Sequence, residues 1–198
     1  METANNIAAK SFTNTSDFLS QKQFDAHIKL YTGYVGKVNE ITDDLASFKD
    51  RGGANATYSQ YRGLKKGEAY ALDGMILHEL YFPLLGNKKM LPGPKTNAIF
   101  DTSFGGFDNW KEDFAACGAA ARGWAVLLYE QRTCSFRNIL MDTHDEGYIA
   151  GGFPLIVMDV YEHAYFIDYG TDKGRYITKF IESLRWDLIE KKAISLNK

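Results

Sequence analysis

Cysteines and long apolar runs are both scarce in this sequence. Only two of its 198 residues are cysteines, Cys117 and Cys134, and they form no CxxC motif. A disulfide framework and a cysteine-based zinc site are therefore disfavoured. The longest apolar stretches, such as 153–160, are far too short to cross a bilayer, and residues 1–13 lack the apolar core of a secretion signal. We expect a cytoplasmic protein with two reduced thiols and no membrane association.

A strong excess of charge of either sign is also lacking. Lys and Arg total 23 against 25 Asp and Glu, so the formal net charge is -2. This balance gives no general attraction to nucleic acid or to an anionic membrane surface. The apolar share of 45% and the charged share of 24% are those of an ordinary globular protein. The length suits one large domain or two small ones.

The first half of the chain has helical periodicity. From Ser20 to about Lys49, apolar and aromatic residues recur at the spacing of one helix face. Ser20 is placed to cap this helix, with Gln23 three residues on as in a capping box. A second helix is predicted over about 67–85, where apolar residues again recur at helical spacing.

The segment Leu91-Pro92-Gly93-Pro94 is the clearest break in the chain. We place a domain boundary there, so that residues 1–91 form a helical hairpin domain and residues 92–198 a second domain. After the boundary the pattern mixes both periodicities, which indicates an α+β protein. The expected elements are a helix at about 108–120, strands at 124–130, 136–141 and 155–160, and helical segments at about 162–169 and 175–191.

Four histidines, His27, His78, His144 and His163, are the only ones in the chain. A lone histidine on an apolar face is usually a structural residue. Here the four lie on separate predicted elements, and three have aromatic-rich apolar neighbours. Asp159 closes the apolar run 154–158, where an unpaired carboxylate is costly to bury. Imidazole and carboxylate ligands suit iron or manganese, and on ligand type alone also zinc.

The segment Asp159-Val-Tyr-Glu-His-Ala-Tyr165 resembles the signature of iron/manganese superoxide dismutases, in which an Asp and a His four residues apart flank an aromatic residue and a Glu. The resemblance extends over nearly the whole chain. Residues 104–111 are similar to the segment that opens the family's second domain, and Gly123-Trp124 to the start of its first strand. His27 and His78 stand at the family's first two ligand positions.

This resemblance implies a fold, a cofactor and an activity. The fold is an N-terminal helical hairpin followed by an α/β domain with a three-stranded antiparallel sheet. One Fe or Mn ion per subunit would lie between the domains, bound by His27, His78, Asp159 and His163. The implied oxidoreductase reaction is the antioxidant disproportionation of superoxide to dioxygen and hydrogen peroxide. A homodimer or a higher oligomer is also implied, and the choice between Fe and Mn stays open.

Further residues are expected around the ion in a protein that resembles this family. His144 lies where relatives often place a Gln that hydrogen-bonds the solvent molecule on the metal, and Gly74 leaves room for it. The alternative for His144 is a loop histidine that faces solvent. Trp124 and Tyr161 would wall the site and exclude water, although plain core aromatics would look the same in sequence.

The first helix is one residue shorter than the family's pattern. The gateway tyrosine commonly follows the ligand histidine by eight residues, whereas Tyr34 follows His27 by seven. At about 100° per residue, seven residues turn a helix by about 700°, which places both side chains on one face. The longer spacing would need a local π-bulge. We therefore expect a regular helix here, with Tyr34 at the substrate entrance.

The deletion also removes a pair of adjacent histidines and leaves Tyr31 nearby. In typical members one of those histidines bonds a tyrosine across the dimer interface, at the position that Phe166 occupies here. Both halves of that bridge are absent. Glu162, which in relatives reaches the ligand histidine of the other subunit, is retained. A homodimer with altered contacts at Glu162 and Phe166 is the expectation.

Two other functions remain open at this point. A non-haem iron oxygenase would use two histidines and one carboxylate, with open positions for dioxygen and a cosubstrate. The third histidine and the resemblance argue against it. A catalytically weak or inactive metal-binding protein on the same fold is the second alternative, because a fold alone does not fix an activity.

Overall fold

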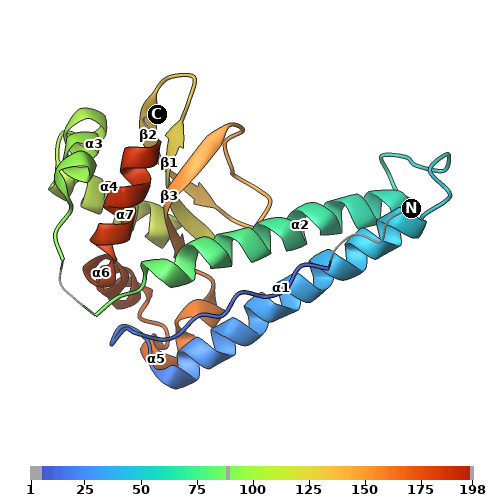
Figure 1. Ribbon diagram of the computed structural model, residues 1–198, viewed down its shortest axis with the longest axis horizontal. Coiled ribbons are helices and arrows are strands. Elements are labelled where there is room, and N and C mark those ends of the chain that lie inside the picture. The colour runs from blue at the N-terminus through green and yellow to red at the C-terminus, as the bar shows by residue number, and fades with distance from the viewer. Residues whose placement is uncertain (1–5, 88–89, 197–198) are drawn as a thin grey trace.

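The structure, a computed structural model, describes residues 6–87 and 90–196 (Figure 1). The expected domain ranges, 1–91 and 92–198, therefore include a few residues outside this described part. The elements in chain order are α1 (Gln21–Ser47), α2 (Gln60–Tyr81), the 3-10 turn η1 (Phe82–Leu84), α3 (Pro94–Phe104), α4 (Phe107–Ala120), β1 (Trp124–Glu130), β2 (Ser135–Met141), β3 (Gly152–Asp159), the 3-10 turn η2 (Glu162–Ala164), α5 (Phe166–Tyr169), α6 (Lys173–Ser183) and α7 (Trp186–Ser195).

Helices α1 and α2 pair as a long hairpin that projects from the rest of the molecule (Figure 1). The Ser20 hydroxyl accepts from the Gln23 N–H at 3.1 Å, so Ser20 caps α1 as predicted. The capping box does not close, because the Gln23 side chain instead donates to the His163 carbonyl at 2.6 Å. The first turn of α1 is thereby tied to the turn that carries His163.

Helix α2 begins about two turns earlier than the sequence predicts. Ser59 is its N-cap and accepts from the Arg62 N–H at 3.2 Å. The turns before Gly67 have few apolar residues, so periodicity alone does not reveal them. Packing against α1 supports them, and Gly67 lets Ile41 approach the backbone closely. The α-helix ends at Tyr81, and Pro83 lies in the 3-10 turn that follows.

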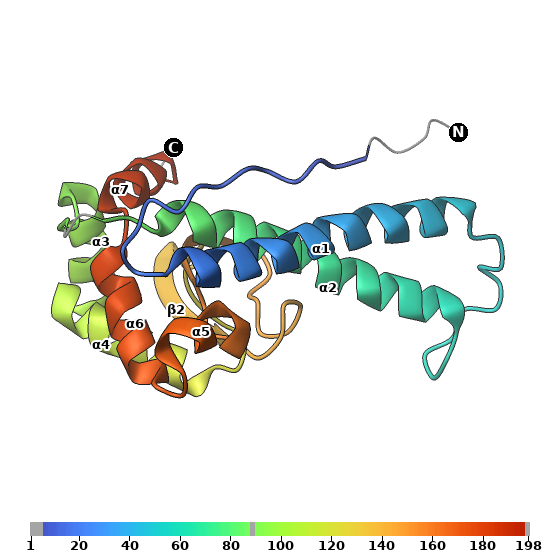
Figure 2. The same cartoon turned by 90° about the horizontal axis from the view of Figure 1, so that it is seen from below.

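The segment that precedes α1 runs back along the hairpin (Figure 2). Ile7 exchanges two hydrogen bonds with the Asn39 side chain, at 2.8 and 2.9 Å. The Lys10 N–H donates to the Tyr31 hydroxyl at 2.8 Å, and that hydroxyl donates to Glu79 at 2.9 Å. Tyr31 is completely buried. It therefore fastens this segment to both helices of the hairpin.

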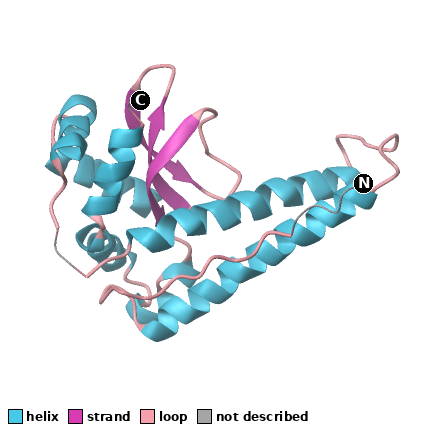
Figure 3. Ribbon diagram, in the orientation of Figure 1, coloured by secondary structure: helices cyan, strands magenta, loops and turns pink. Residues whose placement is uncertain are grey.

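The three strands form one antiparallel sheet in the order β2-β1-β3, and they gather beside the base of the hairpin (Figure 3). The central strand β1 is buried over most of its length, and the register places Trp124 opposite both Met141 and Asp159. Helix α4 packs on β1 and β2, while α2 packs on β3. The α+β class and the three-stranded sheet are as predicted. The sheet therefore delivers Asp159 and Trp124 to the end that faces the hairpin.

Two features of the C-terminal half differ from the sequence prediction. Helix α3 was not predicted; it starts at Pro94 and packs against α4 and α7. The helix predicted at about 175–191 is two helices, α6 and α7. They separate because Leu184 leaves the helix to form a short antiparallel bridge with Leu85. An aromatic cluster between α3, α4 and α7 builds the local core from Phe100, Phe107, Trp110, Phe114 and Trp186.

Among the described helices, none combines the length and the apolar character that a membrane crossing requires.

Glu190 of α7 holds the start of α3, and its removal gives a first test of this packing. Its carboxylate accepts from the Lys95 N–H at 2.7 Å and from the Thr96 N–H at 2.9 Å. We expect Glu190→Ala to lower the free energy of unfolding by about 1–2 kcal/mol, as loss of a helix cap does. Glu112→Ala, an exposed glutamate on α4, is the control in chemical denaturation. Equal stability of the two variants would contradict this role of Glu190.

Candidate metal centre

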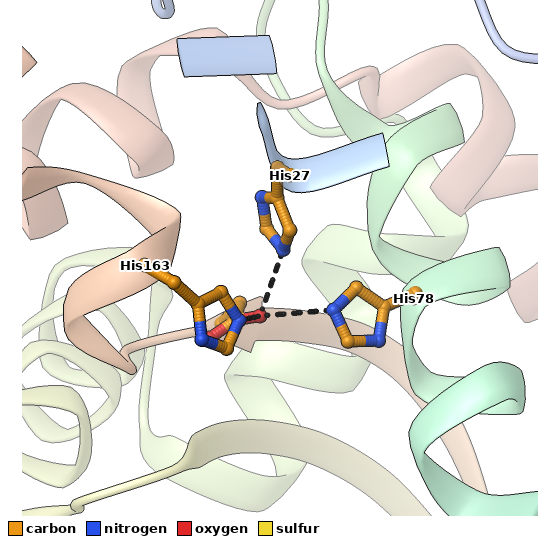
Figure 4. Close-up of side chains that lie close together, drawn as sticks. His27, His78 and His163 are labelled. Atoms are coloured by element: carbon orange, nitrogen blue, oxygen red, sulfur yellow. Dashed lines mark hydrogen bonds and ion pairs between the residues drawn. The ribbon is translucent and has the colours of Figure 1, made fainter. Parts of the chain in front are cut away.

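Four side chains from four separate elements converge at the base of the hairpin. His27 comes from α1, His78 from α2, Asp159 from the end of β3 and His163 from η2. One ligand atom from each lies within 4.8 Å of all the others. Figure 4 shows the three imidazoles, which point toward a common centre from different sides. These are the four residues that the resemblance implies as ligands.

The Asp159 carboxylate lies at the middle of this group. Its Oδ2 atom is 3.0 Å from His27 Nε2, 3.2 Å from His163 Nε2 and 3.5 Å from His78 Nε2. His27, His78 and Asp159 are completely buried. Burying a carboxylate and several imidazoles so closely is costly unless they share a proton or a cation.

The bonding of His78 favours a cation. Its Nδ1 atom lies 2.6 Å from the Gly74 carbonyl, which can only accept, so Nδ1 carries the proton. In the neutral ring, Nε2 then presents a lone pair toward the Asp159 oxygen, and Nε2 has no hydrogen-bond partner among the described residues. Two facing lone pairs repel unless a positive ion lies between them. The residues present therefore fit a bound metal ion, and the backbone orients this ligand as is usual for metal-binding histidines.

The protonation states agree with this reading. Burial is the main cause that lowers the pKa of His27, and burial together with His27 lowers the pKa of His78 to about 3. Burial alone would raise the pKa of Asp159, but His163 and His27 lower it well below its usual range. The pKa of His163 is raised, because Asp159 outweighs the effect of burial. An anionic carboxylate, two imidazoles kept neutral by burial and a third beside the carboxylate form a donor set that suits iron or manganese.

Backbone and side-chain contacts fix the carboxylate. The Tyr161 N–H donates to Asp159 Oδ1 at 3.0 Å, which leaves Oδ2 to face the imidazoles. The Tyr176 hydroxyl donates to the Asp159 carbonyl at 2.6 Å. The Tyr161 ring stacks on His163 with ring centroids 5.2 Å apart. Sequence reasoning identified Tyr161 but missed Tyr176, and it gave Gln23 only a capping role, because both contacts join distant segments.

A second group of side chains lies beside the four. The Trp124 indole N–H donates to His144 Nδ1 at 2.9 Å, and His144 Nε2 lies 2.7 Å from the Tyr34 hydroxyl. Because the indole can only donate, His144 Nδ1 must accept. Burial lowers the pKa of His144 to about 4, so the ring is neutral and its proton is on Nε2. His144 therefore donates to Tyr34, and Tyr34 keeps its own hydroxyl proton free to donate elsewhere.

The regular geometry of α1 and the absence of a side chain at Gly74 make this group possible. Helix α1 is α-helical along its whole length, as the seven-residue spacing predicts. Tyr34 therefore shares the face of α1 that carries His27, and the centroid of its ring lies 5.4 Å from that of the ligand His78. A Cβ atom at Gly74 would come within 3.0 Å of Tyr34 and 3.2 Å of His144. His144 is completely buried, so it is not a loop histidine that faces solvent.

Glu162 and Phe166 lie next to the centre but outside it. Glu162 begins η2 and is exposed, and Phe166 begins α5 with half of its surface exposed. Neither belongs to the group of four ligand atoms. Their expected part in a dimer interface stays a prediction.

Comparison with known proteins gives one consistent family. Residues 92–192 match the model for the C-terminal domain of iron/manganese superoxide dismutases. The chain is 37% identical to "Superoxide dismutase [Fe]" of Aquifex aeolicus, over 88% of this chain and 84% of that protein. It is 35% identical to the Aquifex pyrophilus protein of the same name, over 97% and 90%. It is 33% identical to "Superoxide dismutase [Mn] 1" of Halobacterium salinarum, over 81% and 79%.

The lowered pKa of His144 predicts how acid destabilises the metal-free protein. His144 titrates near 6.5 when unfolded and near 4 when folded, so the unfolded state binds more protons between these values. This contribution to stability is complete above pH 6.5 and is lost as the pH falls toward 4. The slope of the unfolding free energy against pH measures how many more protons the unfolded state binds than the folded state. We expect His144→Gln to reduce this difference by up to about one proton in this pH window.

Tyr34→Phe is the matched control for this measurement. It removes the hydrogen bond to His144 but no group that titrates in this range, because burial raises the pKa of Tyr34. Urea unfolding at several pH values measures both slopes. A slope in His144→Gln equal to that of the Tyr34→Phe protein would contradict the assignment of a neutral, buried His144.

Proposed function

The chain belongs to the iron/manganese superoxide dismutase family, and we propose that it disproportionates superoxide through one Fe or Mn ion bound by His27, His78, Asp159 and His163. The observation that carries this proposal is the convergence of these four ligand atoms within 4.8 Å of one another. The relatives named above are superoxide dismutases by name, and both Fe and Mn occur among them.

When bound, the ion supplies one-electron redox chemistry, which the protein must confine to one small substrate. Two superoxide anions and two protons give one dioxygen and one hydrogen peroxide. The chain contributes three imidazoles and one carboxylate, and the carboxylate would offset part of the ion's charge. Trp124 is completely buried, and its ring lies 5.1 Å from His78 and 6.3 Å from Tyr161. These aromatic walls exclude water and larger reductants from the centre.

Proton delivery falls to the pair formed by His144 and Tyr34. The His144 Nε2–H holds the Tyr34 oxygen from one side, so the Tyr34 hydroxyl proton is free to point toward the substrate. Burial, with a contribution from Tyr70, raises the pKa of Tyr34 and keeps it protonated at neutral pH. Tyr34 Oη can therefore donate to the peroxide as it forms and afterwards regain a proton from solvent.

His78→Ala tests the proposed ligand set. We expect the variant to purify without stoichiometric iron or manganese, because one of four ligands is lost and the remaining donors no longer enclose the ion. His144→Ala is the control, since it removes a histidine that is not a ligand and should retain metal. Elemental analysis measures the bound metal, and superoxide consumption measures activity after reconstitution with each ion separately. Stoichiometric metal in His78→Ala would contradict the assignment.

The same assays separate the two alternatives. Stoichiometric Fe or Mn in the wild-type protein, without superoxide consumption above buffer, would favour a catalytically weak or inactive binding protein. An oxygenase needs only two histidines and one carboxylate. Here a third imidazole, His163, lies 3.2 Å from the same carboxylate oxygen, which supports the dismutase.

We also propose a homodimer that forms through the surface around η2 and α5. Phe166 and Ile167 are both exposed, by 50% and 46%, and Glu162 lies beside them. Typical members bridge the subunits by a histidine, which is deleted here near Tyr31, and a tyrosine, whose position Phe166 occupies. Apolar contact at Phe166 would replace that hydrogen bond.

Phe166→Arg should shift the protein from dimer to monomer in analytical ultracentrifugation, because a buried unpaired charge at a small interface is costly. Ile194→Arg is the control, since Ile194 has a similar exposure of 51% and lies on α7. If both variants sediment like the wild type, this surface is not the subunit interface.

Cytoplasmic location and the division into domains complete the proposal. Cys117 and Cys134 are free thiols, which the reducing cytoplasm would maintain. The family match begins at residue 92, which supports a boundary between a hairpin domain at 1–91 and an α+β domain at 92–198.

A further inference from the structure

Another tyrosine, Tyr70 of α2, lies at the solvent side of the pair formed by Tyr34 and His144. Its ring centroid is 4.5 Å from that of His144 and 6.2 Å from that of Tyr34. Tyr70 is 37% exposed, whereas His144 is completely buried and Tyr34 is half-buried. Tyr70 is therefore placed between this buried pair and bulk water.

The backbone of α2 explains this position. Tyr70 lies one helical turn before Gly74, so the two residues share a face of the helix. Because Gly74 has no side chain, the rings of Tyr34 and His144 can lie close to the backbone there. Tyr70 packs against both rings from the preceding turn of α2. The opposite side of His144 is closed by Trp124, which donates to its Nδ1 atom.

Tyr70 also influences Tyr34. Burial is the largest cause that raises the pKa of Tyr34, and the nearby Tyr70 adds to this effect. Tyr161 approaches the same group, with its ring 5.2 Å from His144. The rings of Tyr34, Tyr70 and Tyr161 thus all gather around His144.

A proton donor at Tyr34 must be reloaded in every catalytic cycle. His144 cannot reload it directly from water, because its ring is buried and its other nitrogen is held by Trp124. Tyr31, which lies near the deleted histidine pair, uses its hydroxyl to bind the Lys10 N–H and Glu79 instead. Phe166 has no hydroxyl to offer. Among these groups, Tyr70 is the one that combines contact with Tyr34 and exposure to solvent.

We propose that Tyr70 is a positioning residue that acts through Tyr34, connecting its hydroxyl to bulk water as the outer member of a proton path. This inference rests on the proposed dismutase function. As Tyr34 Oη gives its proton to the peroxide, Tyr70 Oη passes its own proton to Tyr34 and takes one from water. Each tyrosine ends with the proton count it started with, and no electron moves along the path.

Tyr70→Phe tests the path, because it retains the ring that packs on His144 and removes only the hydroxyl. Tyr58→Phe is the matched control, since Tyr58 is 86% exposed and lies in the loop between α1 and α2. Both variants are measured as holoenzymes by pulse radiolysis over a wide range of superoxide concentration. If the proposed path supplies the protons, its loss lowers kcat at high superoxide, whereas kcat/KM reports capture of the anion.

For Tyr70→Phe we expect kcat to fall by about tenfold or more, as on losing a positioned proton-transfer group, with kcat/KM unchanged. Added imidazole buffer, a small diffusible proton donor, should restore kcat. Azide affinity, measured from the optical spectrum of the holoenzyme, should equal that of the wild type, because azide binding needs no proton path. Tyr58→Phe should match the wild type in all these measurements.

Three results would overturn the inference while leaving the proposed function intact. They are an unchanged kcat in Tyr70→Phe, a fall in kcat that imidazole does not restore, and a parallel fall in kcat/KM and azide affinity. The last result would mean that Tyr70 shapes the anion site. A wild-type holoenzyme without activity would instead overturn the proposed function, and this inference with it.

Discussion

The buried carboxylate of Asp159 is the constraint on which the rest of the structure depends. It has no exposure to water, and its Oδ2 atom meets three imidazole nitrogens within 3.5 Å. A charge so placed is tolerated only with compensating partners. The strand register that puts Asp159 beside Trp124, the Tyr161 N–H on its other oxygen and the Tyr176 hydroxyl on its carbonyl all serve to hold it. The hairpin then supplies His27 and His78 from the opposite side.

The local signals in the sequence were strong enough to predict the class of fold, and the resemblance to a known family selected the four residues that meet at the centre. The three strands and the first helix have clear periodicity, and the motif from Asp159 to His163 is dense in polar groups inside an apolar context. What the sequence did not reveal depends on contacts between distant segments. Helix α3 is held by Glu190 from the far end of the chain, and the break at Leu184 arises from its pairing with Leu85. Neither contact produces a periodic pattern of apolar residues that the sequence would show.

The one-residue deletion in α1 leaves the hydrogen bonding around the centre intact. The shorter spacing between His27 and Tyr34 needs no bulge, so α1 stays regular and Tyr34 still reaches His144. The direction of hydrogen bonding is then set from the core outward. The Trp124 indole fixes the tautomer of His144, and His144 in turn fixes the orientation of the Tyr34 hydroxyl. A completely buried tryptophan thereby sets the direction of the hydrogen bond at Tyr34, on the other side of His144.

The distance in sequence between the ligands has a consequence for how the protein would select its ion. His27 and Asp159 are 132 residues apart, and both are fully buried once the hairpin has docked on the sheet. Three of the four ligands are completely buried, and His163 keeps 27% of its side chain exposed, so an ion held there would be enclosed mainly by the contact between the two halves. If the ion enters while the halves close, the relative supply of iron and manganese during maturation would determine which one is trapped.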